Sequence, residues 1–246
     1  MRFFISRVLA VWLVLAAAAT LAAGCAGNTA SASDATSRQA RVRAFAAEVN
    51  LHASDLPGFK IVAGAMGEPG ALPSPLPREA EVCDGGPLIN GARRGVASAV
   101  FQQQHAPIQT VVSAVYPTRD PSVASTYIAA ADSASGRRCI QREEIRRSDA
   151  ARVQRKSEVV ALDQPAADAP VSGARVWRCL VSDHACNGSP VRSFTDRLWF
   201  AAGRYVVVLV YIAGPRNEAK GPESLALPLE RRLIARLYRR AQAHKP

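Results

Sequence analysis

The chain has 246 residues, of which 48% are hydrophobic and 21% charged, with 31 lysines and arginines against 20 aspartates and glutamates. This composition excludes collagen-like, intrinsically disordered and polytopic membrane proteins. The length favours one folded domain, because a second domain would need a boundary that is visible in the sequence.

Residues 1–24 have the pattern of a secretory signal peptide. Arg2 and Arg7 precede an apolar run from Val8 to Ala23 that ends in small residues. A membrane-spanning helix needs about 20 apolar residues, and this run is shorter. A cleaved leader is therefore favoured over a transmembrane anchor.

The segment Leu21-Ala22-Ala23-Gly24-Cys25 resembles the bacterial lipobox, in which small residues precede a cysteine that becomes the lipidated N-terminus. Ala22 departs from that pattern, which most often has leucine at this position. The resemblance implies that Cys25 carries a diacylglyceryl or palmitate-like anchor on the extracytoplasmic face of the cell membrane. Two acyl chains are enough for stable anchoring. The alternative is an ordinary cysteine after a soluble-protein cleavage site.

Residues 25–36 contain only small and polar side chains after the cysteine, which predicts a flexible tether. Residues 37–246 then form a single domain.

Four further cysteines are present: Cys83, Cys139, Cys179 and Cys186. An even number in an exported protein predicts two disulfide bonds. Of the three pairings, Cys83–Cys139 with Cys179–Cys186 is favoured, because the second pair can close a hairpin. In the chain-entropy model the long closure contributes about 4 kcal/mol and the short one about 2.5 kcal/mol.

A zinc site is the alternative use of these cysteines. Neither their spacing nor the scattered histidines matches a usual zinc motif, so no metal and no cofactor is predicted. The histidines are His52, His105, His184 and His244.

The first half of the domain begins with an amphipathic helix over Arg38–Asn50, with Ser37 as its N-cap. A short strand is expected around Lys60–Ala63, and a long loop rich in proline and glycine over Gly64–Arg94. The apolar stripe of the helix consists of Val42, Phe45, Ala46 and Val49.

Alternating residues predict a hairpin from Gly95–Gln104 and Ile108–Tyr116. Asp120-Pro121 begins a helix that ends near Gly136. The expected apolar stripe of this helix is Val123, Tyr127, Ala130 and Ala134.

The second half repeats this order of strand, strand and helix, with a tight turn at Ala202-Gly203. The pattern predicts an α+β fold, an antiparallel sheet with helices packed on it and two similar halves. The expected strands are Ser157–Leu162, Arg175–Ser182, Val191–Ala201 and Arg204–Ala213, and the final helix is marked by Leu229, Leu233, Ile234 and Leu237.

Several of these features occur in a characteristic order: Leu56-Pro57-Gly58, Cys83, Val96–Tyr116, Pro121–Ala134, Cys139 and Trp199–Leu237. In this order the chain resembles a sensor-like extracytoplasmic domain found in actinobacterial envelope lipoproteins and kinase ectodomains. It departs from that family in Cys179 and Cys186 and in carrying no kinase domain. The resemblance implies a sandwich with a cleft and a sensing or binding role at the cell envelope.

No motif of a known catalytic site is present. Asp183-His184 beside Cys186 is better explained as a hairpin turn, because adjacent strand residues point to opposite faces. Glu143-Glu144 lies among arginines, which indicates a solvated segment with ion pairs. The protein is therefore not expected to be an enzyme.

Basic residues are concentrated in two segments, 137–156 and 231–240. Anionic headgroups or wall polymers could bind them, whereas nucleic acid is absent outside the cytoplasm. The alternative is an arginine-rich composition without a role. The leading hypothesis is a membrane-anchored lipoprotein that binds a small molecule, lipid or envelope protein without catalysis. The others are an interaction module that uses the arginines, and an undetected hydrolase.

Overall fold

The computed structural model describes residues 36–64, 95–103, 108–150, 155–162, 169–180, 192–216 and 227–244. The chain divides into two compact units, Met1–Arg41 and Val42–Pro246. A helix over residues 36–49 crosses this division. The sheet and all the other described helices belong to the second unit.

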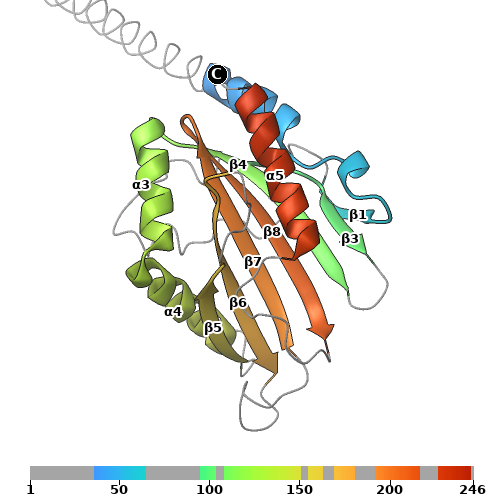
Figure 1. The fold of residues 1–246 in the computed structure, drawn as a ribbon, viewed down its shortest axis with the longest axis vertical. Coiled ribbons are helices and arrows are strands. Elements are labelled where there is room, and N and C mark those ends of the chain that lie inside the picture. Colours follow the sequence, from blue (N-terminus) through green and yellow to red (C-terminus); the bar gives the residue numbers. More distant parts are fainter. Residues whose placement is uncertain are drawn as a thin grey trace, which may run out of the picture. The chain divides into compact units, whose positions relative to one another are not determined.

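An antiparallel sheet forms the centre of the second unit (Figure 1). Its strands follow the order β1-β3-β4-β8-β7-β6-β5, and β2 pairs with β4 off this path. The strands are β1 (Lys60–Ala63), β2 (Val96–Ala97), β3 (Val100–Gln103), β4 (Gln109–Pro117), β5 (Arg155–Ala161), β6 (Ser172–Leu180), β7 (Arg192–Ala202) and β8 (Tyr205–Arg216).

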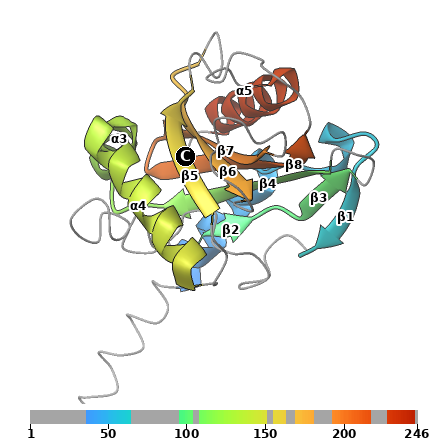
Figure 2. The same ribbon diagram turned by 90° about the horizontal axis from the view of Figure 1, so that it is seen from below.

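Helices cover both faces of this sheet (Figure 2). One face packs against α3 (Pro121–Asp132), which is followed by α4 (Ala134–Ala150). The other face packs against α5 (Pro228–Ala243) and the residues from Val42 to Val49. A short 3-10 helix, η1 (Ala53–Asp55), precedes β1. The observed α+β architecture confirms the predicted fold class.

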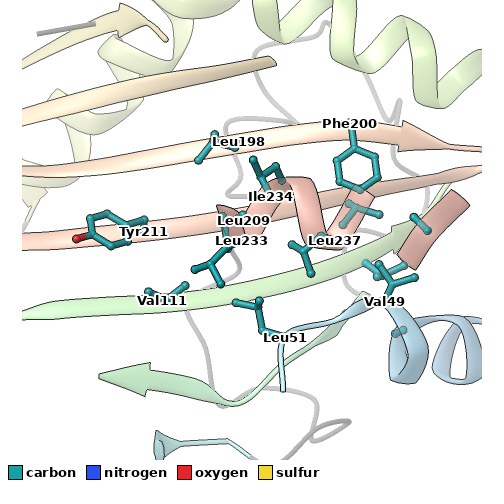
Figure 3. Close-up of a cluster of buried hydrophobic side chains, with 14 of the residues drawn as sticks. Val49, Leu51, Val111, Leu198, Phe200, Leu209, Tyr211, Leu233, Ile234 and Leu237 are labelled. Carbon is teal, nitrogen blue, oxygen red and sulfur yellow. The ribbon is translucent and has the colours of Figure 1, made fainter. Parts of the chain in front are cut away.

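The central strand β8 explains why both layers form. Residues Tyr205–Tyr211 are all buried, because alternate side chains enter opposite cores. Val206 and Val208 pack toward α3, whereas Tyr205 and Leu209 pack toward α5. Figure 3 shows the second of these cores, where side chains of α5 interdigitate with those of β4, β7 and β8. Its labelled members are Val49, Leu51, Val111, Leu198, Phe200, Leu209, Tyr211, Leu233, Ile234 and Leu237.

Most of the predicted elements are confirmed within two to three residues. The strand Lys60–Ala63 forms as β1, and β3 with β4 forms the predicted hairpin. Asp120 caps α3, since its side chain accepts a hydrogen bond from the backbone N–H of Val123. The four residues of the first predicted stripe are all buried. The expected long loop over Gly64–Arg94 lies almost entirely outside the described residues.

Two details of the helices were predicted wrongly. Ser37 lies inside the helix over 36–49 and does not cap it; its hydroxyl accepts a hydrogen bond from Arg41. The buried residues of α3 are Ala124, Tyr127 and Ala131, and the expected Ala134 is exposed. Small alanines allow α3 to approach the sheet closely, so packing decides which of two similar stripes is buried.

The helix expected to end near Gly136 is interrupted earlier. The helix α3 ends at Asp132, and α4 begins only two residues later with Gly136 in its first turn. A Cβ atom on Gly136 would collide with the backbone carbonyl of Ala130. Glycine therefore permits the sharp change of direction between the two helices.

The order of strand, strand and helix occurs twice, as β3-β4-α3 and as β7-β8-α5. The strands β4 and β8 pair with each other at the centre of the sheet. The two helices lie on opposite faces, however, so the similarity of the two halves stays a prediction.

Candidate functional site

Three charged side chains are buried between the sheet and the first turn of α5. Arg175 on β6 and Asp196 on β7 are direct cross-strand neighbours, and Glu230 faces them from α5. The Arg175 Nε donates to Asp196 Oδ1 at 2.7 Å, and its Nη2 donates to Oδ2 at 2.5 Å. The same Nη2 lies 4.0 Å from Glu230 Oε2. The exposed fractions are only 4%, 0% and 0%.

Aromatic rings surround the Arg175 guanidinium. Its carbon lies 4.2 Å from the ring centroid of Phe194 and 5.3 Å from that of Trp177. Phe194 in turn packs against Tyr211, with 6.1 Å between ring centroids. A desolvated cation over aromatic faces gains about 2 kcal/mol, which helps to offset the cost of burying the charge.

Glu230 also completes the start of its own helix. Its Oε2 accepts a hydrogen bond of 2.5 Å from the backbone N–H of Leu227, as a residue at the third helical position can. Its Oε1 is buried and has no hydrogen-bond partner among the described residues. Burial and the neighbouring Asp196 carboxyl raise the pKa of Glu230 to about 9. The hydrogen bond from the Leu227 N–H and the charge of Arg175 lower this pKa, but by less.

The cluster therefore places one guanidinium beside two buried carboxyls, and the raised pKa of Glu230 favours a proton on that side chain. Burial by itself lowers the pKa of Arg175, but the hydrogen bonds and charge of Asp196 raise it above its usual value, so the guanidinium stays charged. Asp196 and Glu230 have no exposed surface, and their contacts with Arg175 join the first turn of α5 to the sheet.

A second ionic contact joins the other end of α5 to η1. Asp55 is 3% exposed and accepts hydrogen bonds of 2.7 Å from Arg236 and of 2.7 and 2.8 Å from Arg240. The backbone N–H of His52 donates to the same carboxylate at 2.9 Å. Burial raises the pKa of Asp55, but the hydrogen bonds from Arg240, His52 and Arg236 outweigh it and leave the pKa below its ordinary value.

We expect Asp55→Asn to lower the free energy of unfolding by about 2 kcal/mol at pH 7, because two arginines lose a charged acceptor. Because the folded-state pKa is depressed, the stabilisation exists above the ordinary pKa of aspartate and is lost as pH falls through the folded value. Urea unfolding at pH 7 and pH 3 should show a smaller difference between the two proteins at pH 3. Glu48→Gln, which alters an exposed pair with His244, should change stability by less than about 0.5 kcal/mol. If Asp55→Asn lowers the free energy of unfolding equally at pH 7 and at pH 3, this explanation is contradicted.

Most of the described basic residues of the two segments lie on two different helices, α4 and α5. On α5, Arg236 and Arg240 are engaged by Asp55, and only Arg232 and Arg239 are exposed. The arginines of the earlier segment belong partly to α4, which lies with α3 on the other side of the sheet (Figure 2). The helical parts of the two basic segments therefore lie on opposite sides of the sheet.

A buried polar network ties the start of the unit to β4. The Ser113 hydroxyl donates to Asn50 Oδ1 at 3.0 Å and accepts from the Leu51 N–H at 2.9 Å. The Asn50 side chain donates to the Val96 carbonyl at 3.0 Å, and Ser98 Oγ accepts from the Ser113 N–H. These groups satisfy one another, which indicates a structural role.

Of the cysteines, Cys139 on α4 is buried and disulfide-bonded. Its pairing stays a prediction, since Cys83 and Cys186 lie outside the described residues and only the backbone of Cys179 is described, in β6. The lipidation candidate Cys25 also lies outside them.

The remaining sequence candidates are Asp183, His184, Glu143 and Glu144. Asp183 and His184 lie outside the described residues, and Glu143 with Glu144 falls within α4. Within the described ranges no group of three or more potential ligands is arranged to hold a metal ion.

The three buried charges belong to no known sequence motif, so motifs do not predict them. Each lies at an apolar position of its own element: Asp196 alternates with Phe194 and Leu198, and Glu230 precedes Leu233 at helical spacing. A charged residue in the middle of an apolar face is the signal that could have identified them.

Comparisons with protein-family models, with curated proteins and with solved structures find no match. In the described part of the chain, every helix is too short or too polar to span a lipid bilayer.

Proposed function

We propose that the protein is an extracytoplasmic lipoprotein, anchored to the cell membrane through Cys25, whose α+β domain binds a small molecule, a lipid or an envelope protein without catalysis. The proposal keeps the resemblance to sensor-like domains of actinobacterial lipoproteins and kinase ectodomains as its closest analogy. It leaves the chemical identity of the bound molecule open.

The observation that carries the proposal is the disulfide bond in which Cys139 takes part. Disulfide bonds persist mainly in proteins exported from the reducing cytoplasm. This agrees with the leader over residues 1–24 and with a lipobox-like segment ending at Cys25.

Metabolic labelling with a fatty-acid analogue tests the anchor on the full chain. The wild-type chain should carry the label and sediment with membranes, whereas Cys25→Ser should lose the label, because serine offers no thiol for the thioether. Ala22→Leu restores the usual lipobox residue and is the matched control; it should be labelled at least as well as wild type. An unlabelled wild type, or a label that survives Cys25→Ser, would contradict the anchor.

Native mass spectrometry of the same purified chain in detergent tests the binding role. A co-purifying mass that is lost on unfolding supports it. Thiol titration under denaturing conditions reports the redox state of the remaining four cysteines, which should be oxidised.

A further inference from the structure

The first turn of α5 is fastened by a contact that needs a proton. Glu230 and Asp196 approach the same nitrogen of Arg175, at 4.0 and 2.5 Å, in a region without solvent. Tyr211 on β8 lies near this guanidinium, and Arg231 adds a buried Nε without a hydrogen-bond partner among the described residues. One cation balances one carboxylate, so the second carboxyl is accommodated only while it is protonated.

The last turns of α5 are fastened by a contact that needs the opposite condition. Asp55 receives three hydrogen bonds from Arg236 and Arg240, and each depends on an ionised carboxylate. The other titratable groups at this end include His52, whose backbone N–H donates to Asp55, and the pair of His244 and Glu48, whose Nε2 and Oε2 lie 3.5 Å apart. All three side chains are exposed, so Asp55 is the buried group whose protonation would release this end.

We propose that α5 is a pH-responsive helix, held at its first turn by a protonated Glu230 beside the Arg175–Asp196 pair and at its last turns by ionised Asp55 between Arg236 and Arg240. Alkaline conditions loosen the first turn, and acidic conditions loosen the last turns. Either change uncovers part of the core that α5 shares with the sheet (Figure 3). This device depends only on the fold and not on the lipid anchor.

The direction of each pH effect follows from the linkage between proton binding and stability. The pKa of Glu230 in the closed state, about 9, exceeds that of an exposed glutamate. Its stabilising contribution is therefore complete below the ordinary glutamate pKa and is lost as pH rises toward 9. For Asp55 the pKa is depressed, so its contribution is lost as pH falls.

Amide hydrogen exchange of the full chain at pH 6, 7 and 8, corrected for the intrinsic rates, tests the alkaline arm. Protection of amides 231–234 should fall by up to about tenfold per pH unit, because the open state releases a proton that the closed state keeps. Protection of amides 240–243 should stay constant in this range. If the ratio of protection between amides 231–234 and amides 240–243 does not change with pH, the proposal is overturned.

Two controls isolate the group responsible. Glu230→Gln keeps the shape of the side chain and the neutral charge of its protonated form. In this variant, protection of the first turn of α5 should no longer depend on pH. In the control Glu48→Gln, which changes an exposed residue, the pH dependence should remain. If Glu230→Gln fails to fold, carboxyl carbon NMR of wild-type chain labelled at glutamate decides. One glutamate titrating above pH 7 supports the proposal, and titration of every glutamate below pH 6 overturns it.

Discussion

Replacing Arg175 by methionine should lower the free energy of unfolding by about 3–5 kcal/mol at pH 7, because it leaves a buried carboxylate without its cation. Asp196 has no exposed surface and receives both of its charged hydrogen bonds from Arg175. Methionine fills a similar volume among Trp177 and Phe194, so the loss reports the charge and not a cavity. Urea unfolding monitored by circular dichroism measures it.

The double variant Arg175→Met with Asp196→Leu is the control. Removing both partners leaves no unpaired charge, and replacing a buried ion pair by apolar residues is often nearly neutral. Most of the stability lost in Arg175→Met should therefore return, which a double-mutant cycle quantifies. A loss below about 1 kcal/mol in the single variant, or no recovery in the double variant, would show that the pair is not a coupled unit.

Replacing Leu233 by alanine should cost about 2–5 kcal/mol. This side chain of α5 has no exposed surface and lies in the core between α5, β4 and β8 (Figure 3). Truncation removes buried methyl groups and leaves a cavity, whereas the helix propensity of the position hardly changes. Differential scanning calorimetry should show a lower melting temperature with an unchanged fold.

Arg232→Ala is the matched control on the neighbouring residue, because Arg232 is exposed. It makes the same change to alanine without entering the core, and it should alter stability by less than about 0.5 kcal/mol. Similar losses for the two variants would mean that α5 does not pack on the sheet as described.

The elements themselves were predictable because their signals are local. Asp120 before Pro121 marks a helix start, and the continuous apolar run Tyr205–Tyr211 marks a strand that is buried on both sides. The stripe of α3 was misplaced by one residue, since alanines on neighbouring faces are equally apolar. Which of them is buried depends on the strand it meets.

The residues of the ionic clusters can be identified in the sequence, but their partners cannot. A charged residue on an apolar face could have been noticed at Arg175, Asp196 and Glu230, but nothing local shows that these three meet. The contacts between Asp55 and the arginines of α5 span 181 and 185 residues. Such distant partners are brought together only by the completed sheet.

By itself, the sequence determined most of the strands, the starts of the main helices and the α+β class, because periodicity and end signals act over a few residues. The tertiary structure decided which face each helix covers and which charges pair, because both depend on strand order. Burial between packed layers then removes the water that would otherwise make those charges independent of one another.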